Sequence, residues 1–177
     1  MSKFILGLVL GTALIPATVA LYLVSGRAPA ATSDRPMPFE RLIARKALKN
    51  KIQREMPTIV PLAANEATFL AGAKVYRKNC AMCHGLPSQS APAVSSRMFP
   101  KAPQLFRTEE MVTDDTPGET FWKAQNGIRL TGMPGFATAL SQEQLWQVSL
   151  LLANADKLPP SVQQELTATA APPLPAK

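Results

Sequence analysis

The stretch Cys80-Ala81-Met82-Cys83-His84 contains both cysteines and the single histidine of the 177-residue chain. In a C-x-x-C-H run the two thiols can add across the vinyl groups of a haem, and the histidine is then held beside the iron as its proximal ligand. Two cysteines three positions apart lie on the same side of a helical turn. The pattern predicts one covalently attached haem c, bound through Cys80 and Cys83, with His84 on the iron.

Two other uses of these residues each lack a required part. A C-x-x-C redox pair is expected in a βαβ setting, which the sequence does not indicate. A closed structural zinc site needs four ligands, whereas Cys80, Cys83 and His84 supply three, and no second Cys/His pair exists in the chain.

The sixth position on the iron is open to several ligands. Because His84 is the only histidine, a second histidine ligand from this chain is excluded, which leaves methionine, lysine, water or a vacant position. Met133 is framed by Gly132 and Pro134, which restrict the loop and keep the approach to the sulfur clear. Met98 and Met111 lack such a frame. Met133 could instead only fill a gap in the core.

Two segments resemble a known family. Residues 71–85, AGAKVYRKNCAMCHG, resemble the opening of a class I c-type cytochrome domain, and residues 126–136, NGIRLTGMPGF, are similar to its axial-methionine loop. The resemblance covers about residues 66–157. It implies an all-α, cytochrome c-like helical domain around the haem, and it favours Met133 as the second axial ligand. It also implies that a carbonyl near a proline accepts a hydrogen bond from His84, for which Pro92 is the candidate.

The first 26 residues predict a membrane anchor. Phe4 to Val24 carry no charge and would span about 31 Å as a helix, enough to cross a hydrocarbon layer of about 30 Å. A cleaved secretory signal is the alternative, with Ala28-Pro29-Ala30 as the cleavage site. The apolar run is longer than the usual signal core and Arg27 lies before that site, so we expect an uncleaved anchor.

The expected orientation of this anchor in the membrane is inferred from the haem attachment site. Arg27, Arg35 and Arg41 follow the apolar run and only Lys3 precedes it, so the charge rule alone would leave the downstream part in the cytoplasm. The resemblance implies that a haem c domain is translocated. We therefore expect the anchor in the inner (cytoplasmic) membrane, with the haem domain facing the periplasm.

The net charge of +7 lies mainly in residues 27–64, which we expect to be a basic linker. Residues 27–55 hold eight basic and three acidic residues, against nine and eight in residues 66–157. This distribution does not indicate a nucleic-acid surface. Residues 39–56 predict an amphipathic helix, which is either a solvated spacer or a helix that contacts anionic lipid or a subunit of a complex.

Residues 65–158 are expected to form the haem domain. Helices are predicted from about Asn65 to Asn79, with an Asn65 N-cap, from Pro117 to Gln125, and from Ser141 to Ala155, with a capping box. A proline-rich loop over residues 86–108 should wrap the haem. Residues 159–177, rich in alanine and proline, are expected to be a disordered tail.

Aromatic, basic and acidic side chains of residues 109–129 have further expected roles. Phe121 and Trp122 are expected to wall the haem pocket. Arg129 either pairs with a haem propionate or is an ordinary surface arginine. The acidic residues of 109–119 are expected to be solvated surface and the start of a helix.

The function expected from these features is one-electron transfer, not enzymatic turnover, in a periplasmic respiratory or photosynthetic chain. Two axial ligands leave no open position for a substrate. The partners would be a redox donor, a redox acceptor and the membrane. The alternatives are a fixed cytochrome subunit of a larger membrane oxidoreductase complex, a gas-binding haem sensor, and a peroxidase or nitrite-type reductase.

Overall fold

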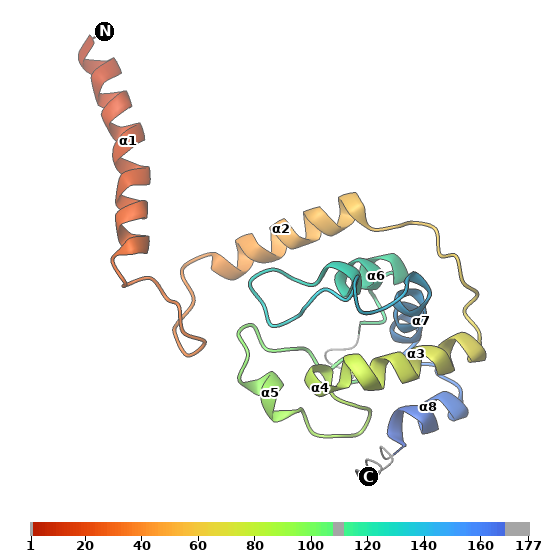
Figure 1. Ribbon diagram of the computed structural model, residues 1–177. Coiled ribbons are helices and arrows are strands. Elements are labelled where there is room, and N and C mark those ends of the chain that lie inside the picture. Colours follow the sequence, from red (N-terminus) through yellow and green to blue (C-terminus); the bar gives the residue numbers. More distant parts are fainter. Residues whose placement is uncertain (1, 108–111, 169–177) are drawn as a thin grey trace. The chain divides into compact units, whose positions relative to one another are not determined.

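The computed structural model describes residues 2–107 and 112–168, in which every regular element is a helix (Figure 1). The chain divides into two compact units, Met1–Ala44 and Arg45–Lys177. The expected all-α fold is confirmed. The boundary between them falls inside the second helix.

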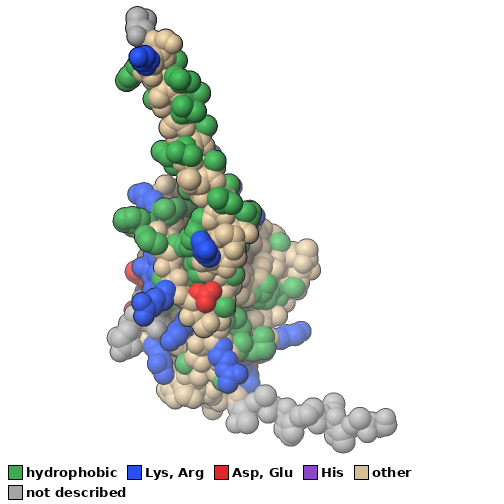
Figure 2. Space-filling model, turned by 90° about the vertical axis from the view of Figure 1, so that its left-hand side faces the viewer, with side chains coloured by type: hydrophobic (Ala, Val, Ile, Leu, Met, Phe, Trp, Pro, Cys, Tyr) green, Lys and Arg blue, Asp and Glu red, His purple; other side chains and the backbone are tan. Residues whose placement is uncertain are grey.

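The first unit contains α1, Ser2–Val24, with Pro16 inside it. Among the described residues, α1 is the one helix long and apolar enough to cross a membrane, with a hydropathy of 2.3 and no buried residue. Figure 2 shows hydrophobic side chains along its length. The hydroxyls of Thr12 and Thr18 donate to carbonyls within the helix, which suits an apolar environment. A signal sequence would meet the same criteria of length and composition.

The second helix, α2 (Glu40–Glu55), confirms the helix expected over residues 39–56. Its C-terminal part belongs to the second unit, where Ile52 is only 2% exposed. The indole Nε1 of Trp122 donates to the Glu55 carboxylate at 3.2 Å. The prediction that residues 27–64 form a linker outside the haem domain is therefore wrong for residues 45–55. Leu48 and Ile52, four positions apart on one face, bring this part of the helix onto the domain.

The core of the second unit is built on α3 (Glu66–Asn79) and α7 (Gln142–Ala153), which pack against each other (Figure 1). The two predicted helix starts are present. The Asn65 side chain accepts from the amide of Thr68 at 3.0 Å, and Ser141 forms a reciprocal capping box with Gln144. These bonds satisfy backbone donors that have no partner within the helix.

The two helices approach closely where Gly72 faces the backbone of α7. A Cβ atom on Gly72 would collide with the carbonyl oxygen of Gln147 and would lie 3.1 Å from the Cβ of Leu151. Tyr76, four positions later, is fully buried and makes an edge-to-face contact with Phe106, with ring centroids 5.0 Å apart. Gly72 thus allows the two helices to approach closely, and Tyr76, on the same face of α3, fills the core next to it.

Helix α6 (Pro117–Asn126) packs on the other side of α7. Thr116 caps it by accepting from the amide of Glu119 at 3.2 Å. Phe121 stacks on Trp146 of α7, with ring centroids 4.2 Å apart. Between α3 and α6 the chain contains two short helices, α4 (Ala81–His84) and α5 (Ala93–Ser96).

Residues 159–177 were expected to be disordered, but Pro160–Thr167 form the last helix, α8. The prediction is wrong for these residues. Val162 and Leu166 are fully buried on the face that packs against α3. Arg77 of α3 forms an ion pair with Glu165 at 2.9 Å. Pro160 starts the helix, and apolar residues four apart supply the buried face despite the low-complexity composition around them. Residues 169–177 lie outside the described residues.

Replacement of Leu166 by alanine tests whether α8 is part of the core. Because the side chain is fully buried, Leu166→Ala should lower the free energy of unfolding by about 2–5 kcal/mol. The exposed neighbour Gln164 is the control, and Gln164→Ala should change it by less than about 0.5 kcal/mol. Denaturant unfolding of the two variants gives the comparison. Equal stability of the two variants would show that α8 does not contribute to the core.

Candidate haem-binding site

The C-x-x-C-H stretch forms a tight helical turn at the end of α3. The amides of Cys83 and His84 both donate to the carbonyl of Cys80, at 3.1 and 2.9 Å. Both cysteines are free of disulfides and half-buried. Burial, together with Cys83, raises the pKa of the Cys80 thiol to about 12.

Both cysteines and His84 border a cavity of about 550 Å³. Its walls come from nearly every element of the second unit: Leu48 of α2, the end of α3, the loop of residues 94–105, α6, the Met133 loop and α7. Most of the lining side chains are apolar. An apolar cavity of this size with a few polar groups is typical of a cofactor site.

The imidazole of His84 bonds to a backbone carbonyl, as expected, but the carbonyl belongs to Pro103 and not to Pro92. Nδ1 lies 2.8 Å from the carbonyl oxygen of Pro103. The choice of Pro92 was wrong, because its carbonyl accepts from the amide and the hydroxyl of Ser95 as part of the start of α5. With Nδ1 bonded to a carbonyl, the neutral ring keeps Nε2 free for a metal. Burial lowers the pKa of His84, although the bond to Pro103 opposes the change.

The loop that carries Met133 borders the same cavity. Its backbone is restrained by a bond from the amide of Ile128 to the carbonyl of Met133 at 3.2 Å, and the Met133 amide donates to the hydroxyl of Thr131 at 3.1 Å. Gly127, with φ of 69°, lies against the Met133 carbonyl, where a Cβ would stand only 2.8 Å away. These restraints come from Gly127, Ile128 and Thr131, and the role inferred for the flanking Gly132 and Pro134 stays a prediction.

A second methionine also reaches the cavity. Met98 lines it, and its side chain lies against Gly132, so close that a Cβ on that glycine would collide with it. Met111 lies outside the described residues. The assignment of the sixth position to Met133 therefore stays a prediction, and Met98 is the competitor that the structure retains.

Two other predicted site residues lie away from the cavity. Trp122 is buried, but it is not among the lining residues, since its indole bonds to Glu55 of α2 and so serves the contact between α2 and α6. The prediction that Trp122 walls the pocket is wrong, and its neighbour Phe121 packs on Trp146 instead. Arg129 is exposed on the loop before Met133, and its pairing with a haem propionate stays a prediction.

Polar groups inside the cavity also fit a haem. Thr120 is one of the residues that line the cavity, and its hydroxyl is buried and has no hydrogen-bond partner in the described part of the chain. Such an orphaned group is costly unless a ligand or water satisfies it. Lys123 also lines the cavity, paired with Asp115 at 2.7 Å and Glu119 at 2.9 Å. Burial alone would lower the pKa of Lys123, but these two carboxylates outweigh it and raise the pKa.

The residues present therefore match the requirements of a covalently bound haem: two thiols and an imidazole in one turn, apolar walls and an available methionine. They would hold the porphyrin through Cys80 and Cys83, and the iron through His84. Groups of three or more His, Cys, Asp or Glu side chains that could hold a bare metal ion do not occur in residues 2–107 and 112–168.

Comparison with known proteins identifies the domain. Residues 67–150 match the family model described as cytochrome c oxidase, cbb3-type, subunit III. This segment is a class I c-type cytochrome domain, and such a domain transfers electrons through a covalently attached c-type haem. The match covers α3 to most of α7 and leaves α1, α2 and α8 outside it.

A search of solved structures found a chain of the reducing HAO-like protein complex of Kuenenia stuttgartiensis. The two are 25% identical, with a TM-score of 0.47, over 56% of this chain and 50% of that one. The present chain thus aligns with about half of that structure. No curated protein matches the chain.

Three residues of the site were missed from the sequence. Pro103 and Thr120 carry no motif, because their roles depend on how the loop and α6 fold around the cavity. Leu48 was placed in a linker, although its spacing from Ile52 was a usable signal for a buried face. Leu48 shows that the C-terminal part of α2, which precedes the matched segment, contributes to the wall of the cavity.

The contribution of α2 can be measured with a matched pair of isoleucines. Ile52 is 2% exposed and Ile59 is 80% exposed. Ile52→Ala should lower the free energy of unfolding of the haem-loaded protein by about 2–5 kcal/mol, because it leaves a cavity under α2. Ile59→Ala should change it by less than about 0.5 kcal/mol. If the two variants unfold at the same denaturant concentration, α2 is a spacer and not part of the domain.

Proposed function

We propose that the protein is a membrane-anchored, single-haem electron carrier whose iron is bound by His84 and Met133. When bound, the haem supplies an iron that changes between two oxidation states by one electron. The observation that carries the proposal is the meeting of Cys80, Cys83, His84 and Met133 at one apolar cavity. Histidine and methionine together favour electron transfer, because they occupy both axial positions and raise the reduction potential.

The chain's own residues have separate tasks in this proposal. Pro103 fixes the His84 ring through Nδ1, and the hydrogen bonds of the Met133 backbone restrain the loop that carries the sulfur. The apolar walls exclude water from the cavity, which strengthens the electrostatic effect of every fixed charge. A site with few mobile parts suits a reaction in which only an electron moves.

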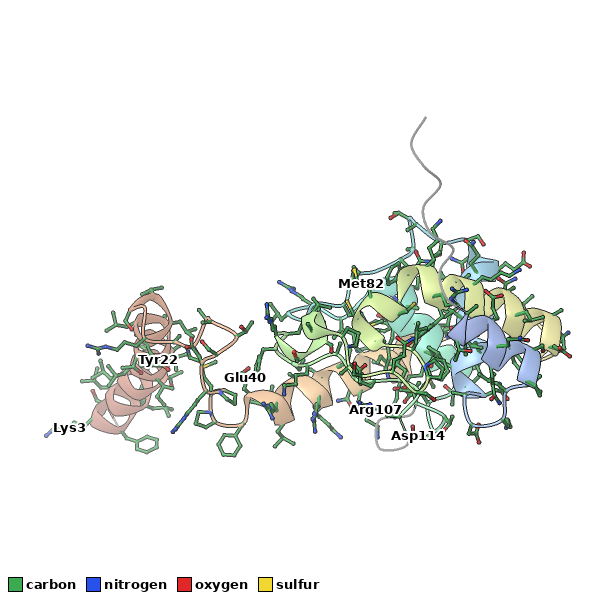
Figure 3. All side chains as sticks on the ribbon, turned by 90° about the horizontal axis from the view of Figure 1, so that it is seen from below. Lys3, Tyr22, Glu40, Met82, Arg107 and Asp114 are labelled. Atoms are coloured by element: carbon green, nitrogen blue, oxygen red, sulfur yellow. The ribbon has the colours of Figure 1, made fainter. Side chains whose placement is uncertain are left out.

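Electron exchange requires that partner proteins approach the haem. Met82, inside the attachment turn, borders the cavity and is 74% exposed (Figure 3). Val94 also borders the cavity and is 42% exposed. We propose that a redox donor and a redox acceptor dock against these exposed apolar side chains, because they border the cavity that would hold the haem.

The proposed location is the inner membrane, with the haem domain in the periplasm. The support is α1, which has the length and hydropathy of a membrane-spanning helix. Three apolar side chains at the start of α2 are at least 65% exposed: Phe39, just before the helix, and Leu42 and Ile43 within it. Several lysines and arginines lie near them in the sequence. An exposed apolar and basic surface near an anchor suits anionic lipid or a subunit of a membrane complex.

A fixed subunit of a larger membrane oxidoreductase is the second candidate. It is favoured by the family model, which is named for a subunit of an oxidase. Extraction of native membranes with a mild detergent, followed by size-exclusion chromatography, separates the two possibilities. Migration of the haem absorbance as a small single-chain particle supports a carrier, and comigration with other subunits supports the fixed subunit.

Replacement of each methionine at the cavity tests the axial ligand. Met133→Ala should leave the haem covalently attached, lower the midpoint potential and allow the reduced protein to bind carbon monoxide, because the sixth position opens. Met98→Ala should keep the native potential and bind no carbon monoxide. Met82→Ala, at an exposed site of the same motif, is the control.

Two outcomes would contradict this assignment. If Met98→Ala opens the iron and Met133→Ala does not, Met98 is the ligand. If the unmodified reduced protein binds carbon monoxide without rearrangement, the iron has an open position and the gas-binding alternative gains support. The optical spectrum and a potentiometric titration of each full-length variant decide among these results.

A further inference from the structure

The C-terminal end of the attachment turn leaves backbone carbonyls without partners in the helix. Buried side chains satisfy two of them. The hydroxyl of Tyr76 donates to the carbonyl of Gly85 at 2.8 Å, and the Nε2 of Gln104 donates to the carbonyl of Cys83 at 3.3 Å. Tyr76 comes from α3, whereas Gln104 comes from the loop that wraps the cavity. The turn is therefore held from two sides.

Gln104 connects three parts of the site through one carboxamide. Its side chain is largely buried, with the residue 7% exposed, and Nε2 also lies 3.3 Å from the hydroxyl of Ser95 and 3.1 Å from the carbonyl of Ala102. Ser95 in turn donates to the carbonyl of Pro92 at 2.8 Å. One side chain thus links the attachment turn, the short helix α5 and the backbone just before Pro103.

The fit around this carboxamide is close. Gly85, with φ of 72°, packs directly on the Gln104 Oε1, and a Cβ at that position would collide with it. A glycine is therefore required both by the backbone conformation and by the contact.

Pro103, the residue before Gln104, bears the carbonyl that bonds to His84. Proline has no backbone N–H, so this residue cannot anchor its own position by donating a hydrogen bond. It lines the cavity, so part of its exposed surface faces the space assigned to the haem. The carbonyl stays 2.8 Å from the His84 Nδ1 because its neighbours are held, and the Gln104 side chain bonds to the residue before it and to the turn opposite it.

We propose that Gln104 is a positioning residue for the proximal histidine: it fixes the Pro103 carbonyl against Nδ1 of His84 and thereby sets the strength of that hydrogen bond. The inference rests on the proposed ligation of the haem iron by His84. A bond from Nδ1–H to a carbonyl makes the imidazole a stronger electron donor to the metal. A stronger donor favours the more highly charged, oxidised iron, so Gln104 should hold the reduction potential down.

The test uses the full-length, haem-loaded protein with Gln104→Met, which keeps the length of the side chain but removes its donor. The midpoint potential should rise, and hydrogen exchange at the Nδ1–H of His84, followed by NMR of the reduced protein, should become roughly tenfold faster as that bond weakens. Gln164→Met, on the exposed side of α8, is the matched control and should change neither quantity.

Ser95→Ala provides a milder variant in case Gln104→Met does not fold. It removes one partner of the carboxamide and leaves the carboxamide itself, so both readouts should move in the same direction by a smaller amount. If Gln104→Met or Ser95→Ala lowers thermal stability but leaves the potential and the exchange rate unchanged, Gln104 only packs the loop and the proposal is wrong. Failure of the proposed function would be distinct, since it would appear in the unmodified reduced protein as an open iron that binds carbon monoxide.

Discussion

The constraint on which the structure depends is the placement of two thiols and one imidazole in a single helical turn at the wall of an apolar cavity. Cys80, Cys83 and His84 face about 550 Å³ of space to which α2, α6, α7 and two loops all contribute. Well-packed domains contain few voids of this size, because an unfilled cavity loses contact energy on every side. A haem held by Cys80, Cys83 and His84 would fill this space, so it would contribute to the core as well as to the redox chemistry.

Helices and loops contribute differently to the surroundings of the cavity. The helical part is the crossing of α3 and α7 at Gly72, where a side chain would collide with the backbone of α7, together with α8, which packs against α3. The loop of residues 86–107 packs on this core through Leu105 and Phe106, and it also supplies the Pro103 carbonyl that bonds to His84. We therefore expect the loop to affect both the stability of the domain and the hydrogen bond to the proximal histidine.

Much of the site was predictable from the sequence because its chemistry is local. The attachment turn, the capped starts of α3 and α7 and the framed Met133 are all decided by residues within five positions of one another. The failures have long-range causes. The carbonyl that holds His84 belongs to Pro103 rather than Pro92, which already serves the start of α5, and Trp122 turns toward Glu55, which is 67 positions away in the chain. Composition also misled: proline and alanine around Val162 and Leu166 concealed a helix with a buried face.

The central claim is the covalent bond between the chain and its haem, and extraction under denaturing conditions tests it most directly. Full-length protein is treated with acidified acetone, and the pellet is examined for haem absorbance, chain mass and reactive thiols. The account predicts that the haem stays with the polypeptide, that the mass exceeds that of the chain by one haem, and that neither cysteine reacts with a thiol reagent. Haem in the acetone phase, or a colourless chain with two reactive thiols, would contradict it.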